Sequence, residues 1–448
     1  MANSRKSSRV DLSRLVASLP ASQGERVVLG LSGGLDSVVL LHILKDLSAK
    51  SGFSLSCVHV HHGISPNAGC WAKFCEDLCN SLDVPIYIEQ VDISPHLSKG
   101  VEAAARSARY EVFGRVNADF LALAHHRDDQ AETVLLQLFR GSGVKGLSAM
   151  GEATSFGAAR LVRPLLRASR EDLEQYAKTR QLRWVEDESN HDPRFDRNFL
   201  RREVLPLVAD RYPSCRETLA RASAHFREAS ELMEELARID ANGAIQAGRL
   251  KMHALADLSP ARAKNLMRHY LEQFGVRMPS AARLEEMLKQ LRTARPDASI
   301  AIRHDGMEVR SYRGWVHVVP ERENPGGLEV PILQPLPTGI PELSGVLHFE
   351  AAEGGLDPRM FPFVVRTRRG GERLRLHSDG PARSLKNLFQ ESAIPPWQRK
   401  RLPLLFRGDR LVWVPGIGMD PECRVKGVGI LPVWKPFPAE SETLLAEP

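Results

Sequence analysis

Short runs of β-branched and aliphatic residues alternate with longer amphipathic stretches between about Arg26 and Arg180. The runs RVVLGL, LSCVHV, PIYIEQV and DFLALA are each followed by a segment of helical periodicity. This alternation predicts an α/β domain with a doubly wound parallel sheet, covered by helices on both faces. Because ligands of such sheets bind at the carboxyl ends of the strands, we expect the loops after Leu29, Val60 and Ala124 to form the functional site.

The rest of the 448-residue chain has a different pattern and is long enough for further cores. Beyond Pro206, amphipathic helical stretches predominate, with a few strand-like runs such as SIAIRH and WVHVVP. A Pro- and Gly-rich passage, ENPGGLEVPILQPLPTGIPEL, has the composition of a linker. We therefore predict an α/β domain at 1–215, a mainly helical middle domain at 216–325, a linker at 326–343 and a small α+β domain at 344–448.

Composition narrows the class of protein. Hydrophobic residues make up 43% of the chain and charged residues 26%, as in soluble globular proteins. The sequence has no apolar run of about 18 residues and no secretory signal at its start, so we expect a cytoplasmic protein without membrane contact. A net charge of +6 gives a mild preference for polyanions. The six cysteines include no CxxC pair, which argues against a disulfide framework and a cysteine-bound metal.

The sharpest local signal is a glycine-rich loop between the first predicted strand and the helix after it. The loop consists of Ser32, Gly33, Gly34, Leu35, Asp36 and Ser37. Glycines let the backbone turn tightly and approach an anion, and the start of the following helix presents unpaired N–H groups. Loop and helix together predict a phosphate-binding site. The alternative without function is a glycine-rich turn capped by serine or aspartate.

One residue distinguishes this loop from a Walker A loop, in which a lysine precedes the hydroxyl residue and meets the phosphates. Here that position holds the carboxylate of Asp36. Phosphates repel a carboxylate unless a cation lies between them, so we interpret Asp36 as a ligand of Mg²⁺ or a group close to the chemistry. The SGGLDS loop resembles that of the N-type ATP pyrophosphatases, whose Rossmann-like domain binds ATP, releases pyrophosphate and transfers AMP.

Further motifs distinguish among the families that share this loop. They are VHVHHG, VEAAARSARY, AHHRDDQAET, RGSGVKGLSAM and EDESNHDPRFDRNFLR, and with the loop they span about residues 26 to 205. In order and spacing they resemble the tRNA(Ile)-lysidine synthetases of the long, bacterial type. The resemblance implies an enzyme that adenylates the wobble cytidine of the isoleucine tRNA with a CAU anticodon, then couples lysine to carbon 2. It implies release of AMP and pyrophosphate and a change of codon reading from AUG to AUA, and it is compatible with a homodimer.

This chemistry makes definite demands on the residues. The oxygen at carbon 2 of cytidine is a poor leaving group, so it must be adenylated before an amine can displace it. The incoming lysine carries a cationic ε-ammonium, which must be bound and must lose a proton before it attacks. Asp129 and Glu132 are three residues apart at the start of a predicted helix, hence on one face, and we assign them to lysine. Taken alone, acidic residues in a first turn are ordinary partners of the helix dipole.

The resemblance assigns roles to residues throughout the first domain. The catalytic group that it implies is Asp36, Asp129, Glu132 and Arg197. Within this group, Arg197 suits the charge that develops on phosphate. To ATP we also assign His59 and Arg106, and to tRNA Arg109 and Arg201. The alternatives are histidines that belong to the core and arginines that are merely solvated.

The C-terminal segment is rich in arginine, and aromatic residues interrupt the positive charges. Such density suits contact with phosphates and some stacking on bases. The string VVRTRRGGERLRLHSDGPARSLKNLFQESAIPPWQRKRLPLLFRGDRLVWVPG also resembles the C-terminal domain of the bacterial synthetases. The residues that we assign to tRNA here are Arg368, Arg369, Arg383, Lys386 and Trp397. A solvated basic surface is the alternative.

Three other functions fit parts of the sequence. A tRNA thiolation enzyme would share the loop, but it needs cysteines arranged to carry sulfur or a cluster, and the chain lacks a CxxC pair. A synthetase with its own glutaminase would need an early catalytic cysteine, whereas the first cysteine is Cys57 in a predicted strand. A non-catalytic RNA-binding protein with a relict loop would not need the intact Asp36, Asp129 and Glu132.

Overall fold

The computed structural model describes residues 11–95, 100–188, 192, 194–293 and 300–437, and the chain divides into two compact units, Met1–Met233 and Glu234–Pro448. Among the described residues, none of the helices is both long and apolar enough to cross a membrane. The elements of the first unit are α1 Leu12–Val16, β1 Arg26–Gly30, α2 Leu35–Ser51, β2 Ser54–His61, α3 Ala68–Ser81, β3 Ile86–Gln90, α4 Val101–Arg115, β4 Phe120–Ala122, α5 Arg127–Phe139, α6 Val144–Leu147, β5 Ala153–Phe156, β6 Ala159–Val162, α7 Arg170–Thr179, α8 Asp196–Phe199, the π turn η3 Leu200–Val204, α9 Leu205–Arg211 and most of α10 Cys215–Ala241.

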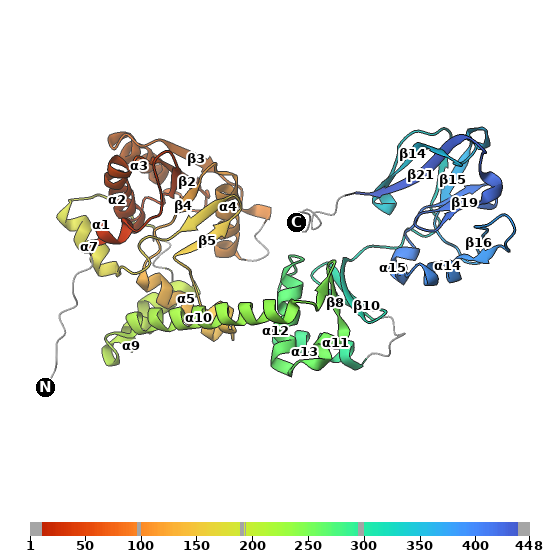
Figure 1. The fold of residues 1–448 in the computed structure, drawn as a ribbon. Coiled ribbons are helices and arrows are strands. Elements are labelled where there is room, and N and C mark those ends of the chain that lie inside the picture. The colour runs from red at the N-terminus through yellow and green to blue at the C-terminus, as the bar shows by residue number, and fades with distance from the viewer. Residues whose placement is uncertain (1–10, 96–99, 189–191, 193, 294–299, 438–448) are drawn as a thin grey trace. The chain divides into compact units, whose positions relative to one another are not determined.

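The first unit is built on a six-stranded sheet in the order β3-β2-β1-β4-β6-β5. Strands β3, β2, β1, β4 and β6 run parallel, and only the edge strand β5 is antiparallel to its neighbour. Helices α2, α3 and α7 cover one face and α4 covers the other (Figure 1). The predicted doubly wound parallel sheet is therefore confirmed, with one antiparallel strand added at its edge.

Alternation along β1 shows why this sheet is buried on both sides. Val27 and Leu29 point into the core beneath α2, while Val28 between them points into the core beneath α4. All three side chains are buried, as expected for a central strand whose successive residues face opposite layers. Burial on both faces fixes the strand firmly. The end of β1, and the loop after it, therefore lie at the carboxyl end of the parallel strands.

The second unit begins within α10 and contains first a mixed helical and antiparallel region. Its elements are β7 Ile245–Gln246, β8 Arg249–Lys251, α11 Met252–Asp257, α12 Pro260–Glu272, α13 Ala281–Thr293, β9 Ala301–His304, β10 Met307–Tyr312 and β11 Trp315–Pro320. The strands form an antiparallel sheet in the order β7-β8-β11-β10-β9. Three helices pack their apolar stripes on this sheet around the buried Tyr270, whose hydroxyl donates to the carbonyl oxygen of Val316 or Gly248.

The C-terminal region of the same unit is mainly β. Its elements are β12 Glu329–Ile332, β13 Thr338–Ile340, η4 Pro341–Leu343, β14 Gly345–Glu353, η5 Pro358–Met360, β15 Phe363–Arg366, β16 Arg373–Leu374, β17 Arg383–Ser384, α14 Leu385–Glu391, α15 Pro396–Arg399, β18 Leu404–Arg407, β19 Arg410–Val414, β20 Gly418–Met419, η6 Pro421–Cys423 and β21 Val428–Pro436. One sheet has the order β12-β15-β18-β19-β20, and a second has the order β13-β14-β21. These strands with two short helices form the α+β region that the sequence predicted.

The passage at 326–343 is not the linker that its composition predicted. It contributes β12 to the five-stranded sheet and β13 to the three-stranded sheet, and Ile332 and Ile340 are buried in the C-terminal core. Both strands lie at the edge of their sheets. An edge strand tolerates proline because one side of it forms no ladder hydrogen bonds, which is why Pro331 can lie inside β12.

Candidate active site

The glycine-rich loop turns sharply between β1 and the 17-residue helix α2. Gly33 has a φ of +85°, a left-handed conformation that favours glycine. The loop is closed by its own serines: the Gly34 N–H donates to Oγ of Ser32 at 3.3 Å, and Oγ of Ser37 donates to the Gly34 carbonyl at 3.0 Å. The first N–H groups of α2 have no partner within the helix and point out of its N-terminus, which gives the loop the geometry of an anion cradle.

Replacing Gly33 by alanine should destabilise the fold as well as the cradle. A Cβ at this position would lie 2.9 Å from Cγ2 of Val185 and 3.0 Å from Sγ of Cys75. Because these close contacts add to the strain of a left-handed backbone, we expect Gly33→Ala to lower the free energy of unfolding by about 1–3 kcal/mol, measured with denaturant.

Gly34→Ala is the matched control for this prediction. Gly34 has a φ of −72°, and its added Cβ would meet only Oγ of Ser32 at 3.5 Å, an ordinary contact. We expect its free energy of unfolding to stay within about 0.5 kcal/mol of the wild type. Equal losses of stability in the two variants would contradict the argument from the backbone of Gly33.

Two acids on α5 form the second part of the site, and two arginines from α8 and η3 hold them. The Glu132 carboxylate is fully buried and accepts hydrogen bonds from Nε of Arg197 at 2.8 Å and from Nε and Nη2 of Arg201 at 2.6 and 2.9 Å. Asp129 accepts from Nη2 of Arg201 at 3.0 Å and of Arg197 at 3.3 Å. The acids therefore share one face of α5, as their spacing predicted.

Asp129 also closes the start of α5. Its Oδ2 accepts from the backbone N–H of His126 at 3.0 Å, in a capping box with the His126 ring. Burial acts to raise the pKa of Asp129, but the nearby His126, Arg197 and Arg201 outweigh it and hold the pKa below its ordinary value. Asp129 is therefore a carboxylate at neutral pH, ready to bind a cation.

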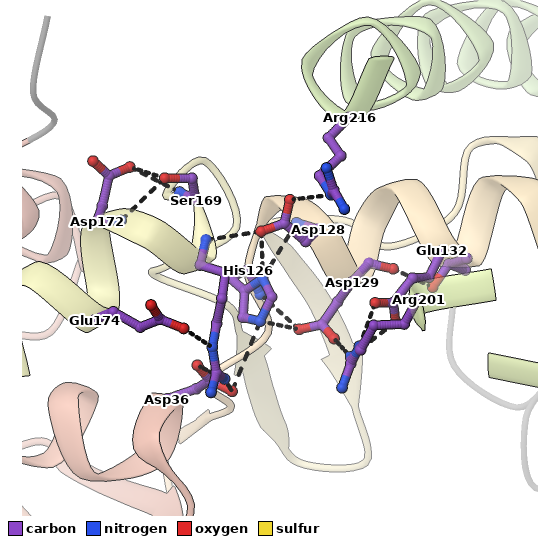
Figure 2. Close-up of polar contacts among 12 residues, drawn as sticks. Asp36, His126, Asp128, Asp129, Glu132, Ser169, Asp172, Glu174, Arg201 and Arg216 are labelled. Atoms are coloured by element: carbon purple, nitrogen blue, oxygen red, sulfur yellow. Dashed lines mark hydrogen bonds and ion pairs between the residues drawn. The ribbon is translucent and has the colours of Figure 1, made fainter. Parts of the chain in front are cut away.

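Asp36 from the glycine-rich loop lies in the same cluster. Nη1 of Arg170, the first residue of α7, donates to both of its oxygens at 2.7 and 2.8 Å. Burial raises the pKa of Asp36 above its ordinary value, although the nearby His126 and the charge of Arg170 act to lower it. The His126 ring links this carboxylate to α5, because its Nε2 lies 3.7 Å from Oδ2 of Asp36 and 3.4 Å from Oδ2 of Asp129 (Figure 2).

The other predicted residues of the first unit lie on β2 and α4. His59 is buried at the end of β2 beneath the loop, and its Nδ1–H donates to the Leu31 carbonyl at 2.8 Å. Arg106 and Arg109 project from α4 and are exposed. The Arg106 guanidinium stacks on the ring of Tyr110 at 4.8 Å, and Nη2 of Arg109 lies 3.4 Å from Nε2 of His62.

The residues assigned to tRNA in the C-terminal region belong to the second unit. Arg368, Arg369 and Arg383 form ion pairs with Glu372, Glu329 and Glu391 respectively. Lys386 is exposed on α14. Trp397 packs edge-on against Tyr312 and His317, and the guanidinium of Arg310 lies 5.3 Å from its ring. Residues of the same unit therefore already pair with part of the positive charge, and pack against part of the aromatic surface, that we expected to contact RNA.

Three residues that the sequence did not place in this cluster belong to it. Arg170 pairs with Asp36, His126 lies between Asp36 and Asp129, and Nε of Arg216 at the start of α10 lies 3.2 Å from Oδ1 of Asp128. The S-x-x-D pattern beginning at Ser169 marks a helix start and could have located Arg170 at its first turn. Spacing could also have placed Arg201 in the cluster, since it follows Arg197 by one helical turn and contacts the same two acids.

Comparisons with known proteins match most of the chain. The PP-loop domain family matches residues 5–208, the TilS substrate binding domain residues 250–317, and the TilS substrate C-terminal domain residues 363–428. The tRNA(Ile)-lysidine synthase of Nitrosomonas europaea is 43% identical over 423 residues, 92% of each chain. That of Azoarcus sp. is 40% identical over 438 residues, 96% of this chain and 95% of its own.

The chain belongs to the tRNA(Ile)-lysidine synthase family. The resemblance inferred from the motifs is thereby confirmed, and with it a ligase that uses ATP through a PP-loop domain. The domain boundary predicted at 215 stays a prediction, as do the individual roles of the site residues.

Proposed function

We propose that this protein couples lysine to carbon 2 of the wobble cytidine of the isoleucine tRNA with a CAU anticodon. The oxygen at carbon 2 attacks the α-phosphate of ATP and pyrophosphate leaves. The lysine ε-ammonium loses a proton to Asp129 or Glu132, the amine attacks carbon 2, the bond to oxygen breaks, and AMP leaves. One observation carries the proposal: Asp36 of the phosphate loop and the amine-binding candidate Asp129 flank the same imidazole, at 3.7 and 3.4 Å. Nucleotide and amine can therefore meet at one place.

Two guanidiniums lie where lysine would bind the acids Asp129 and Glu132. Asp129 and Glu132 carry two negative charges, and Arg197 and Arg201 balance them. A third cation fits only if one guanidinium moves, because a buried cluster with excess positive charge is costly. Arg201 is the more exposed of the two, with 39% of its side chain accessible against 25% for Arg197. We infer that lysine displaces Arg201, which is then free to contact phosphate.

The residues around Asp36 fit a magnesium ion only if the nucleotide supplies further ligands. Among the described residues, no group of three or more His, Cys, Asp or Glu side chains is arranged to hold a metal. Mg²⁺ in nucleotide sites is commonly held by one or two carboxylates together with phosphate oxygens, so Asp36 suffices as the protein ligand. When bound, Mg²⁺ would neutralise phosphate charge, and Arg170 would have to release at least one Asp36 oxygen.

The decisive test of this function is the dependence of AMP release on both co-substrates. Purified protein with ATP should release AMP only when lysine and the isoleucine tRNA are both present. Mass spectrometry of the digested tRNA should show lysidine at the wobble position. Turnover that ignores lysine, or that proceeds equally with a tRNA lacking a wobble cytidine, would refute the proposal. A homodimer and a cytoplasmic location remain predictions from the sequence.

A further inference from the structure

His126 has an unusual position for a helix cap. It precedes α5, it is only 3% exposed, and it contacts carboxylates from two different elements. Its Nδ1 accepts a hydrogen bond from the backbone N–H of Asp128 at 3.2 Å. Serine, threonine, aspartate or asparagine would provide such a cap with a smaller side chain. The cap alone therefore does not account for an imidazole here.

The hydrogen bond at Nδ1 determines what the other ring nitrogen does. Since Nδ1 accepts from the Asp128 N–H, Nε2 is the ring nitrogen that carries a proton. Nε2 faces Oδ2 of Asp129 at 3.4 Å and Oδ2 of Asp36 at 3.7 Å. The third nearby carboxylate, Asp128, lies on the Nδ1 side at 3.7 Å. One N–H thus lies between the loop carboxylate and the α5 carboxylate (Figure 2).

Such a donor solves an electrostatic problem at this place. Asp36 and Asp129 carry like charges in a poorly solvated site, and like charges repel more strongly where water is excluded. Arg170 holds Asp36 from α7, and Arg197 and Arg201 hold Asp129 from the other side. The imidazole of His126 lies between these two carboxylates, with Nε2 at 3.4 Å from Asp129 and 3.7 Å from Asp36.

We propose that His126 is a positioning residue that fixes Asp36 relative to Asp129 through its Nε2 proton, so that bound nucleotide and bound amine are aligned. This inference rests on the proposed function. In that reaction His126 does not touch the reacting atoms. It acts through the two carboxylates, and its loss should impair the alignment of amine and adenylated cytidine more than the binding of ATP.

Two substitutions separate the cap from the bridge. Asparagine places an acceptor oxygen where Nδ1 lies, so His126→Asn keeps the cap but cannot reach Asp36. Glutamine places an amide N–H near the position of Nε2, so His126→Gln keeps a donor for the carboxylates but replaces the cap with a weaker one.

We expect His126→Asn to unfold within about 2 °C of the wild type and to bind ATP within about two-fold, while kcat for lysidine formation falls about 30-fold. His126→Gln should unfold a few degrees lower, yet retain kcat within about five-fold of the wild type. Thermal unfolding, ATP titration and single-turnover formation of lysidine measure these quantities. A purely structural role would instead make activity follow stability, with Asn the more active variant.

The inference is overturned if Asn retains full kcat, or if Asn is more active than Gln. Lysidine formation by the wild-type protein distinguishes this outcome from failure of the proposed function. If wild-type protein makes lysidine and the two variants show the wrong order, only the role of His126 is refuted. If wild-type protein makes no lysidine, the proposed function itself fails.

Discussion

Glu132→Gln should abolish lysine transfer, with kcat/KM for lysine lowered at least about 1000-fold, equivalent to about 4 kcal/mol. Glutamine matches glutamate in size, but it carries no charge to bind an ammonium. Its NH₂ group would also face Arg197 and Arg201, which are donors themselves, where the carboxylate accepts three hydrogen bonds. Steady-state assays with varied lysine measure the effect.

The same change should lower stability, and the size of that loss matters for interpretation. Glu132 is buried, but its partners Arg197 and Arg201 are partly solvated, so water can compensate for part of the lost ion pair. We expect a loss of about 1–3 kcal/mol in the free energy of unfolding, below the 3–5 kcal/mol typical of a fully buried pair. The variant should therefore fold, and its loss of activity should exceed any loss of folded protein.

Glu308→Gln provides a matched control in the second unit. Glu308 is also buried, and it accepts hydrogen bonds from Nε of Arg310 at 2.7 Å and of Arg303 at 3.3 Å. Its substitution removes the same kind of carboxylate from the same kind of arginine pair, so stability should fall comparably while KM for lysine stays within about two-fold. The assignment of Glu132 to lysine is wrong if its variant keeps kcat/KM within ten-fold, or if Glu308→Gln lowers it equally.

The sequence predicted the elements whose burial is visible in a short run of neighbouring residues. β1 is flanked by strands and covered by helices, so its residues Val27, Val28 and Leu29 are uniformly apolar and reveal a buried parallel strand. The passage at 326–343 misled for the opposite reason. Its strands β12 and β13 lie at sheet edges, where proline costs little, and the residues of β12 pair with residues of β15 that lie 31 to 37 positions further along the chain. Composition does not reveal such a partner.

The candidate site shows the same division. The spacing of Asp129 and Glu132 predicted that both would lie on one face of a helix, and they do. Their partners Arg197 and Arg201 lie 65 to 72 residues further along the chain, and Arg170 is 134 residues from Asp36. Long-range pairs of this kind depend on how α7 and α8 pack, which the periodicity of one segment does not specify. The motifs therefore indicated the acids and Arg197, but not the way in which each acid is neutralised.

Asp36→Asn should lower kcat for pyrophosphate release about 1000-fold at saturating Mg²⁺, while the binding of metal-free ATP becomes stronger. Asparagine keeps the shape of the side chain and one acceptor for Arg170, which donates to both oxygens of the carboxylate. It removes the negative charge that a divalent cation needs, and with it the repulsion of the phosphates. Even with the full screening of bulk water, this repulsion at about 4 Å is on the order of 1 kcal/mol, so metal-free ATP should bind at least about five-fold more tightly.

Glu174→Gln is the control for Asp36→Asn, because it removes an acidic partner of Arg170 but leaves the charge of Asp36 in place. Glu174 is the other acid that pairs with Arg170, through Nε at 3.3 Å, and it is half exposed. Its loss should change turnover and metal-free ATP binding less than two-fold, because a solvated pair contributes under about 1 kcal/mol. Calorimetric titration with ATP in EDTA, and turnover against Mg²⁺ concentration, distinguish the two variants. If Asp36→Asn bound metal-free ATP more weakly, the carboxylate would be supporting the loop through Arg170 and not acting on phosphate through a cation.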